Sequence, residues 1–292
     1  MKNEYGEMKY PDDFINKIIC GNCLEVMKDI PNDSIDLVIT SPPYNKAGYE
    51  GFIRKRHKRD SWNSGRNIEY DGNANNDFMP EKDYQEQQIE VLNEIHRVLK
   101  PDGSLFYNHK IRVAQHKASH PIEWILKSNF TFRQQIIWNR KSSPTVSPIR
   151  YMPTTELIFW LTKTPCQPNF KRDKNVLFFG EVWEFSAKPN PLHPAPFPEE
   201  LPKNIMMCIE NKSNIIVLDP YVGIGTTLKA AKNFNFNYIG IDTSKEYCDI
   251  ARKRVNATPE LLFTLKDTTA VNTKEEGFLD FPLGNVRGNK CT

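Results

Sequence analysis

Long apolar runs are missing from this sequence of 292 residues. Runs such as Ile35–Ile39 and Ile215–Leu218 are far shorter than the roughly 20 residues that a helix needs to cross a bilayer. The first five residues are polar and do not have the apolar stretch of a secretory signal. We therefore expect a cytoplasmic protein with no membrane partner.

Cysteine is sparse and scattered, with six residues at positions 20, 23, 166, 208, 248 and 291. Disulfide frameworks belong to short, cysteine-dense secreted domains, so we expect reduced thiols. Cys20 and Cys23 have Cys-x-x-Cys spacing, but neither a second pair nor a suitable histidine pair completes a tetrahedral zinc site. We expect both to pack in the core and expect no metal site.

The net charge of +3 excludes no class of protein, but the charge is unevenly distributed. Seven basic residues stand against Glu50 and Asp60 in one short segment: Lys46, Arg54, Lys55, Arg56, Lys58, Arg59 and Arg66. A solvated surface loop would have the same composition. The alternative is a loop, over 46–76, that contacts DNA phosphates.

Short apolar runs alternate with segments of helical spacing along most of the chain. The runs predict strands at 17–20, 35–39, 104–107, 133–138, 156–161, 214–218 and 238–241. The helical spacing predicts helices at 23–28, 81–100, 121–127, 199–210, 226–233 and 245–255. Such alternation predicts an α/β fold with a mostly parallel sheet covered by helices on both faces. Ligands of these folds bind at the carboxyl ends of strands.

A glycine-containing turn, Asp219–Thr227, follows one predicted strand. Gly223 and Gly225 allow a tight turn and a close approach of the backbone to a ligand. Asp242 ends the next strand, where a carboxylate can accept hydrogen bonds from ribose hydroxyls. A simple tight turn would show the same pattern, and Leu228 at the third glycine position argues against a nicotinamide dinucleotide. A ligand without phosphate, such as S-adenosylmethionine, fits better.

A proline-rich turn, Ser41-Pro42-Pro43-Tyr44, follows the strand predicted at 35–39. A rigid turn with an exposed tyrosine would look the same. The residue types also fit methyl transfer to an exocyclic amine of a base, whose lone pair is delocalised into the ring. The Ser41 hydroxyl and the Pro42 carbonyl would accept the two amine hydrogens and favour a pyramidal nitrogen. Tyr44 would stack on a base flipped out of the duplex.

Together, the two turns resemble the β-group of amino DNA methyltransferases, in which a Ser/Asp-Pro-Pro-Tyr/Phe motif precedes the cofactor motif. The resemblance extends over roughly 17–256 and includes His-Pro-Ala-Pro-Phe-Pro at 193–198. It implies a Rossmann-like methyltransferase fold with a circularly permuted motif order, in a catalytic domain at 1–256. We expect a small target-recognition insertion at 164–191 and assign no structure to the tail at 257–292.

The resemblance implies S-adenosylmethionine as cofactor, double-stranded DNA as partner, and a role for each matching residue. The catalytic residues are Ser41, Pro42, Pro43 and Tyr44. The cofactor-binding residues are Asn22, His193, Pro194, Phe197, Asp219, Tyr221, Gly223, Gly225, Thr226, Thr227 and Asp242. Asn22 stands where many relatives have an aspartate that contacts the adenine amino group, so its contact would be made without charge.

The target base follows from the form of the motifs. Relatives that begin the catalytic motif with serine are mostly N4-cytosine enzymes, and the segment 193–198 is closer to theirs. We predict site-specific transfer to cytosine N4, with adenine N6 as the alternative. The residues also leave open an RNA or protein methyltransferase, an oxidoreductase and a non-catalytic DNA-binding module. The family implies a prokaryotic or phage setting, a monomer or homodimer, and a restriction–modification system with a separate endonuclease.

Overall fold

An eight-stranded sheet forms the centre of the computed structural model, which describes residues 8–45, 79–114, 117–143, 151–166, 168–170, 180–186, 197–210 and 213–258. The strand order is β1-β10-β9-β2-β3-β7-β6-β8, and β4 and β5 form a separate hairpin. The strands are β1 (Lys17–Cys20), β2 (Ile35–Thr40), β3 (Leu99–His109), β4 (Arg112–Ala114), β5 (Lys117–Ser119), β6 (Thr131–Asn139), β7 (Thr155–Thr162), β8 (Val182–Glu184), β9 (Ile216–Asp219) and β10 (Asn237–Asp242). The pairs from β1 to β3 are parallel, whereas β7 runs antiparallel to β3 and β6.

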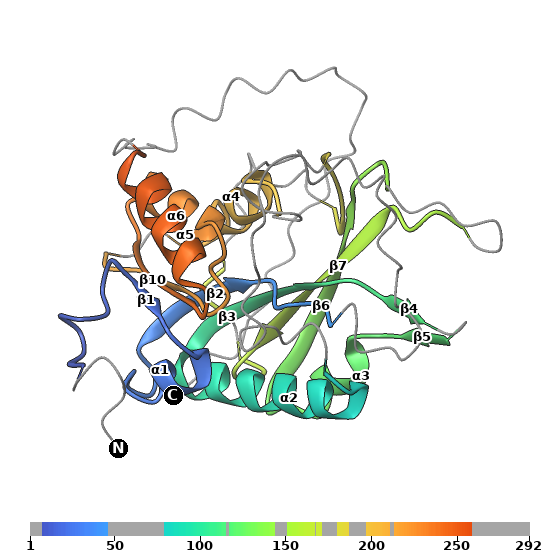
Figure 1. Ribbon diagram of the computed structural model, residues 1–292, viewed down its shortest axis with the longest axis horizontal. Helices are drawn as coiled ribbons and strands as arrows, with labels where there is room; N and C mark the ends of the chain where they lie inside the picture. Colours follow the sequence, from blue (N-terminus) through green and yellow to red (C-terminus); the bar gives the residue numbers. More distant parts are fainter. Residues whose placement is uncertain are drawn as a thin grey trace.

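Helices cover both faces of this sheet (Figure 1). One face carries α1 (Cys23–Met27), α2 (Glu81–Val98) and α3 (Ile122–Ile125); the other carries α4 (Glu200–Met206), α5 (Thr226–Asn233) and α6 (Lys245–Asn256). Side chains of β2 alternate between the two layers, as the pleat requires: Val38 joins the core under α2, and Leu37 and Ile39 join the core under α4. The structure confirms the predicted α/β fold with a mostly parallel sheet.

The predicted and observed elements differ most around Pro101. The sequence predicts a helix to position 100, but α2 ends at Val98, and Leu99 is already extended. Proline disfavours helical backbone at the residue before it, so Lys100 cannot continue the helix. Strand β3 therefore begins at Leu99, and an irregularity in its pairing with β2 accommodates Pro101. The hairpin β4–β5 was not predicted.

The described cysteines are in two states. Cys20, Cys23, Cys208 and Cys248 are free, and burial raises the pKa of Cys23 to about 11, as fits a thiol packed in the core. Cys166 is disulfide-bonded, so the prediction of reduced thiols is wrong at this position. The spacing of the cysteines in the sequence could not reveal this bond.

Within the described ranges, no helix is long and apolar enough to cross a membrane.

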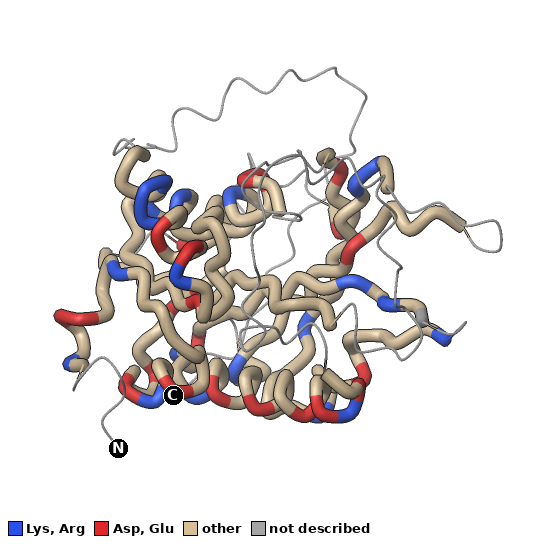
Figure 2. Tube along the Cα trace, in the orientation of Figure 1, with Lys and Arg blue, Asp and Glu red and all other residues tan. Residues whose placement is uncertain are grey.

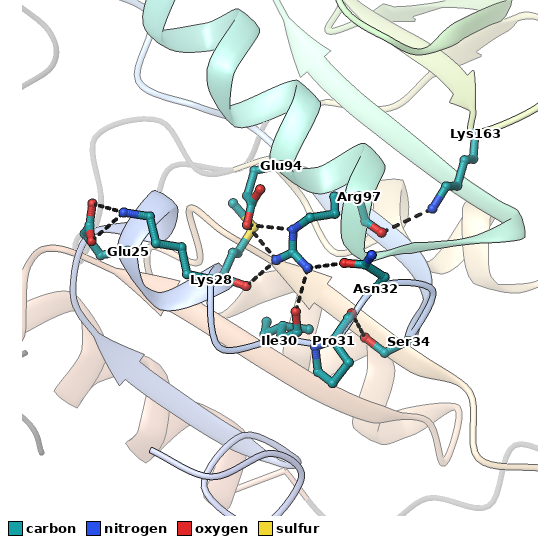
Figure 3. A network of polar contacts seen from close by, with 10 residues as sticks. Glu25, Lys28, Ile30, Pro31, Asn32, Ser34, Glu94, Arg97 and Lys163 are labelled. Carbon is teal, nitrogen blue, oxygen red and sulfur yellow. Dashed lines mark hydrogen bonds and ion pairs between the residues drawn. The ribbon is translucent and has the colours of Figure 1, made fainter. Parts of the chain in front are cut away.

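Arg97, near the end of α2, connects that helix to the chain that leads from α1 into β2 (Figure 3). Its guanidinium donates to the carbonyls of Met27 at 2.7 Å and Ile30 at 2.9 Å, and to the side chain of Asn32 at 2.6 Å. Glu94, one turn earlier, holds the guanidinium in place at 2.6 Å. One side chain thus satisfies several backbone and side-chain acceptors that precede β2.

We expect Arg97→Ala to lower the free energy of unfolding by roughly 2 kcal/mol, because partly buried acceptors lose a charged donor. Urea denaturation measures this change. Lys28→Ala is the matched control, since Lys28 forms an exposed ion pair with Glu25 and its loss should change stability by less than about 0.5 kcal/mol. Equal effects of the two substitutions would contradict the bridging role of Arg97.

Candidate active site

The segment 41–44 leaves the sheet at the carboxyl end of β2. The prolines restrict the backbone, Pro42 and Tyr44 are buried, and Ser41 is partly exposed. Asn45, with a positive φ of 47°, ends the turn and is fully buried. Its amide donates to the Met79 carbonyl and accepts from the Met79 amide, both at 2.9 Å. Asn45 therefore fixes the backbone of Met79 beside the turn.

A cluster of hydrogen bonds surrounds the hydroxyls of Ser41 and Tyr44, which lie 2.8 Å apart. Tyr44 donates to a carboxylate oxygen of Glu156 at 3.1 Å. The Asn108 amide donates to the Tyr44 hydroxyl at 2.8 Å and to the same Glu156 oxygen at 3.0 Å, and Arg140 pairs with the other oxygen at 3.1 Å. Burial, aided by the Glu156 charge, raises the pKa of Tyr44 well above its usual value, so its hydroxyl keeps its proton.

Tyr84 and His109 support the turn from the side of α2. The Tyr84 hydroxyl donates to the carbonyl of Pro43 at 2.7 Å and lies 2.8 Å from Nε2 of His109. Burial lowers the pKa of His109 to about 3, so a neutral ring packs against Tyr44 with centroids 4.6 Å apart. The Tyr44 side chain is only 8% exposed, and its stacking on a flipped base stays a prediction.

The glycine-containing turn connects β9 to α5 and packs against α6. Gly223 and Gly225 have φ of 48° and 80°, values that residues other than glycine rarely adopt. A Cβ at Gly225 would lie 3.0 Å from Cβ of Ala251, so a side chain there would also push α6 away. The turn therefore needs glycine for both backbone conformation and packing.

Asp242, the last residue of β10, holds this turn from the neighbouring strand. One carboxylate oxygen accepts from the backbone N–H of Gly223 at 2.9 Å and the other accepts from Ser244 at 2.8 Å. Burial raises the pKa of Asp242, which nevertheless stays partly exposed. Each carboxylate oxygen has two lone pairs, so both retain capacity for ribose hydroxyls. The arrangement fits the nucleoside of S-adenosylmethionine.

Asp219 joins the two turns to each other. Its buried carboxylate accepts from the Thr40 hydroxyl at 2.7 Å and from the Thr227 hydroxyl at 2.6 Å. Thr40 directly precedes Ser41, and Thr227 lies in the first turn of α5. Burial is the main cause that raises the pKa of Asp219 to about 6. Asp219 and Thr227 thus hold the motifs together, and their direct contact with a cofactor stays a prediction.

The raised pKa of Asp219 predicts a pH-dependent stability. Between its ordinary value of 3.8 and about 6, the folded protein binds the proton more tightly than the unfolded chain, so this contribution falls as pH rises through that window. Relative to wild type, Asp219→Asn should gain about 2 kcal/mol of stability between pH 4 and pH 7.5. Urea denaturation of both proteins at the two pH values tests this, and a pH-independent difference would contradict it.

The other predicted cofactor residues lie in different settings. The Asn22 side chain accepts from the Leu24 amide at 2.9 Å and caps α1, at the end of β1 beside Asp242. Tyr221 follows Asp219 in the turn, Thr226 is buried at the start of α5, and Phe197 packs on the α4 side of the sheet. His193, Pro194 and the seven basic residues from Lys46 to Arg66 lie outside the described residues. For all of these, the predicted contacts stay predictions.

Comparison with known proteins agrees with this geometry. A family model described as DNA methylase, of the N6 and N4 methyltransferases, matches residues 35–253 and so includes both turns. The chain belongs to this DNA methylase family. The Type II methyltransferase M.BglII of Bacillus subtilis is 30% identical over 285 residues, which cover 86% of this chain and 72% of that protein.

Solved structures of DNA methylases share the fold of this one. The PvuII DNA methyltransferase (cytosine-N4-specific) superimposes with a TM-score of 0.61 at 21% identity, over 81% of this chain and 85% of that one. The complex of M1.HpyAVI with S-adenosylmethionine does so with a TM-score of 0.57 at 23% identity, over 82% of this chain and 98% of that one. The predicted Rossmann-like methyltransferase fold is confirmed.

The sequence reasoning missed three polar residues of this DNA methylase that surround the Tyr44 hydroxyl: Asn108, Arg140 and Glu156. Each stands at or next to the end of a strand, and Asn108 and Glu156 are buried, which is unusual for polar side chains. A search for polar residues at both ends of the predicted strands would have found them. Their partners could not be known before the strand order was known.

Proposed function

We propose that this DNA methylase transfers a methyl group from S-adenosylmethionine to an exocyclic amine of a base in double-stranded DNA, with cytosine N4 as its target. The observation that carries the proposal is the pair of hydrogen bonds that Thr40 and Thr227 donate to buried Asp219. They join the catalytic turn to the cofactor turn, although Thr40 and Asp219 are 179 positions apart in the chain. The Ser41 hydroxyl and the Asp242 carboxylate then lie at the same edge of the sheet.

The chemistry needs a positioned amine more than a strong base. When bound, S-adenosylmethionine would supply a methyl group on a sulfonium, which leaves as a neutral thioether, and the methylated amine would then release one hydrogen as a proton to water. The partly exposed Ser41 hydroxyl accepts one amine hydrogen and the Pro42 carbonyl accepts the other, so the nitrogen lone pair turns towards the methyl group. Tyr84 bonds to the carbonyl of Pro43 and not to that of Pro42, which is consistent with this division of roles.

Cytosine N4 is favoured by the serine at position 41, by the form of the segment 193–198 and by the likeness to the cytosine-specific PvuII enzyme. Adenine N6 is the second candidate, because the same two acceptors would serve an adenine amine and the family includes both kinds of enzyme. A non-catalytic DNA-binding module would not need the bonded arrangement around Ser41.

The charges of the described surface suit DNA at this edge of the sheet. Figure 2 shows basic residues on the hairpin β4–β5, which follows the carboxyl end of β3, and a mixture of acidic and basic residues along α2. In the hairpin, Lys117 is exposed, whereas Arg112 is buried and pairs with Glu81 at 2.6 Å. We expect phosphates to contact the hairpin side and the basic segment 46–66. A bacterial or phage cytoplasm, a separate endonuclease, a monomeric or homodimeric state and target recognition by 164–191 stay predictions.

The test is methylation of mixed-sequence duplex DNA with labelled S-adenosylmethionine, followed by mass spectrometry of the nucleosides. N4-methylcytosine would support the whole proposal. N6-methyladenine would retain the cofactor and the mechanism and reject the target base. Label in RNA or protein, with none in DNA, would overturn the proposal.

A further inference from the structure

Glu156 is a buried carboxylate that the sequence reasoning did not connect with the catalytic turn. It is 7% exposed and lies near the start of β7. Because β7 runs antiparallel to β3, its first residues lie beside the last residues of β3, with Leu157 opposite His109. This direction brings Glu156 to the edge where the parallel strands end, within 3.1 Å of the Tyr44 hydroxyl.

The number of available protons sets the direction of the hydrogen bonds in this cluster. Arg140 donates to one oxygen of Glu156 and the Asn108 amide donates to the other, so Glu156 acts as an acceptor at both oxygens. The bond between Tyr44 and Glu156 must therefore use the single Tyr44 proton. The Tyr44 oxygen is then left as an acceptor, so the 2.8 Å contact with Ser41 must use the Ser41 proton. The Ser41 hydroxyl donates inward.

Asn108 reinforces this direction. Its nitrogen, and not its oxygen, faces Glu156 and Tyr44, at 3.0 Å and 2.8 Å. The opposite orientation would place the amide oxygen against a carboxylate oxygen, which repels it. The same nitrogen lies 3.4 Å from the Ser41 oxygen. Ser41 therefore donates to Tyr44, and both Tyr44 and Asn108 donate to Glu156. One lone pair of the Ser41 oxygen remains available on the side that faces away from Tyr44.

We propose that Glu156 is a positioning residue that sets the direction of these hydrogen bonds, so that Ser41 turns a lone pair, and not its proton, towards the target amine. Without a fixed acceptor behind Tyr44, the serine hydroxyl could rotate and point its proton at the amine nitrogen. That proton would bind the lone pair that has to attack the methyl group. The inference rests on the proposed function, because it needs an amine that donates to Ser41.

The first test is Glu156→Gln, which keeps the shape of the side chain but introduces an N–H donor facing Tyr44. Tyr44 can then donate to Ser41, and Ser41 can donate outward. We expect kcat for DNA methylation to fall by about 10-fold to 100-fold, with KM for S-adenosylmethionine unchanged. Glu86→Gln is the matched control, because Glu86 forms an exposed ion pair with Lys82 at 3.7 Å on α2; its kcat should stay within about twofold of wild type.

A double-mutant cycle separates positioning from a general structural role. If Glu156 acts through Tyr44, then Tyr44→Phe removes the connection, and adding Glu156→Gln should change kcat by less than about twofold. A further fall of about 10-fold when Glu156→Gln is added to Tyr44→Phe would overturn the inference. If Glu156→Gln does not fold, Tyr44→Phe alone decides: we expect kcat at least about fivefold below wild type, and a wild-type kcat would overturn it.

The wild-type enzyme separates this inference from the function on which it rests. No methyl transfer to DNA by the wild type would overturn the proposed function and the role of Glu156 with it. Active wild type, loss of activity in Ser41→Ala and unchanged kcat in Glu156→Gln would overturn the role of Glu156 alone.

Discussion

Ser41→Ala is expected to lower kcat for methyl transfer at least about 100-fold, because a hydrogen-bonding group positioned at the reacting atom is lost. The alanine cannot accept the amine hydrogen, so the nitrogen lone pair stays delocalised in the base. The affinity for S-adenosylmethionine should not change, since the cofactor turn is held by Asp219 and Asp242 and not by Ser41. Single-turnover kinetics with labelled cofactor measure the first effect, and calorimetry measures the second.

The matched control for this experiment is Ser34→Ala. Ser34 is a serine just before β2 whose hydroxyl donates to the Pro31 carbonyl at 2.7 Å, far from the catalytic turn. Its loss should leave kcat within about twofold of wild type. A kcat of Ser41→Ala within about threefold of wild type would show that the Pro42 carbonyl alone orients the amine, and would remove Ser41 from the mechanism.

The edge of the sheet that carries the site could be predicted because it is made mainly by parallel strands. Each apolar run of β2, β9 and β10 ends at a polar residue: Thr40, Asp219 and Asp242. Ligands of such sheets bind at the carboxyl ends of the strands, so the two turns that follow β2 and β9 were expected at ligand-binding positions. In the structure, Asp219 accepts a hydrogen bond from Thr40, and Asp242 accepts one from Gly223, so these strand ends and turns meet at one edge of the sheet.

Glu156 and Asn108 could not be assigned in the same way. An apolar run predicts a strand but not its direction or its neighbours, and β7 has β3 on one side and β6 on the other. Had β7 been parallel to β3, Glu156 would lie at the opposite edge, away from Tyr44. The Thr40 hydroxyl was missed for a related reason, because its partner Asp219 is distant in sequence and is reached only through the pairing of β2 with β9.

Asp242→Ala is expected to weaken binding of S-adenosylmethionine about 100-fold, equivalent to about 3 kcal/mol. Two losses combine in this variant. The Gly223 amide loses the acceptor that holds the turn at 2.9 Å, and the ribose hydroxyls lose the carboxylate that would accept from them. Asp242→Asn should have a smaller effect, because its amide oxygen can still accept from one of the two sides.

Asp249→Ala is the control that makes the Asp242 result specific. Asp249 lies on α6 close to the same strand end, but its carboxylate pairs with Lys245 at 2.8 Å and Arg252 at 2.7 Å on the exposed surface. Its loss should leave cofactor affinity within about twofold of wild type, because exposed ion pairs contribute little. Calorimetric titration of both variants decides the matter: equal affinities would mean that Asp242 does not bind the ribose. If both proteins are folded and Asp242→Ala binds S-adenosylmethionine about 100-fold more weakly than Asp249→Ala, the carboxylate at the end of β10 holds the cofactor.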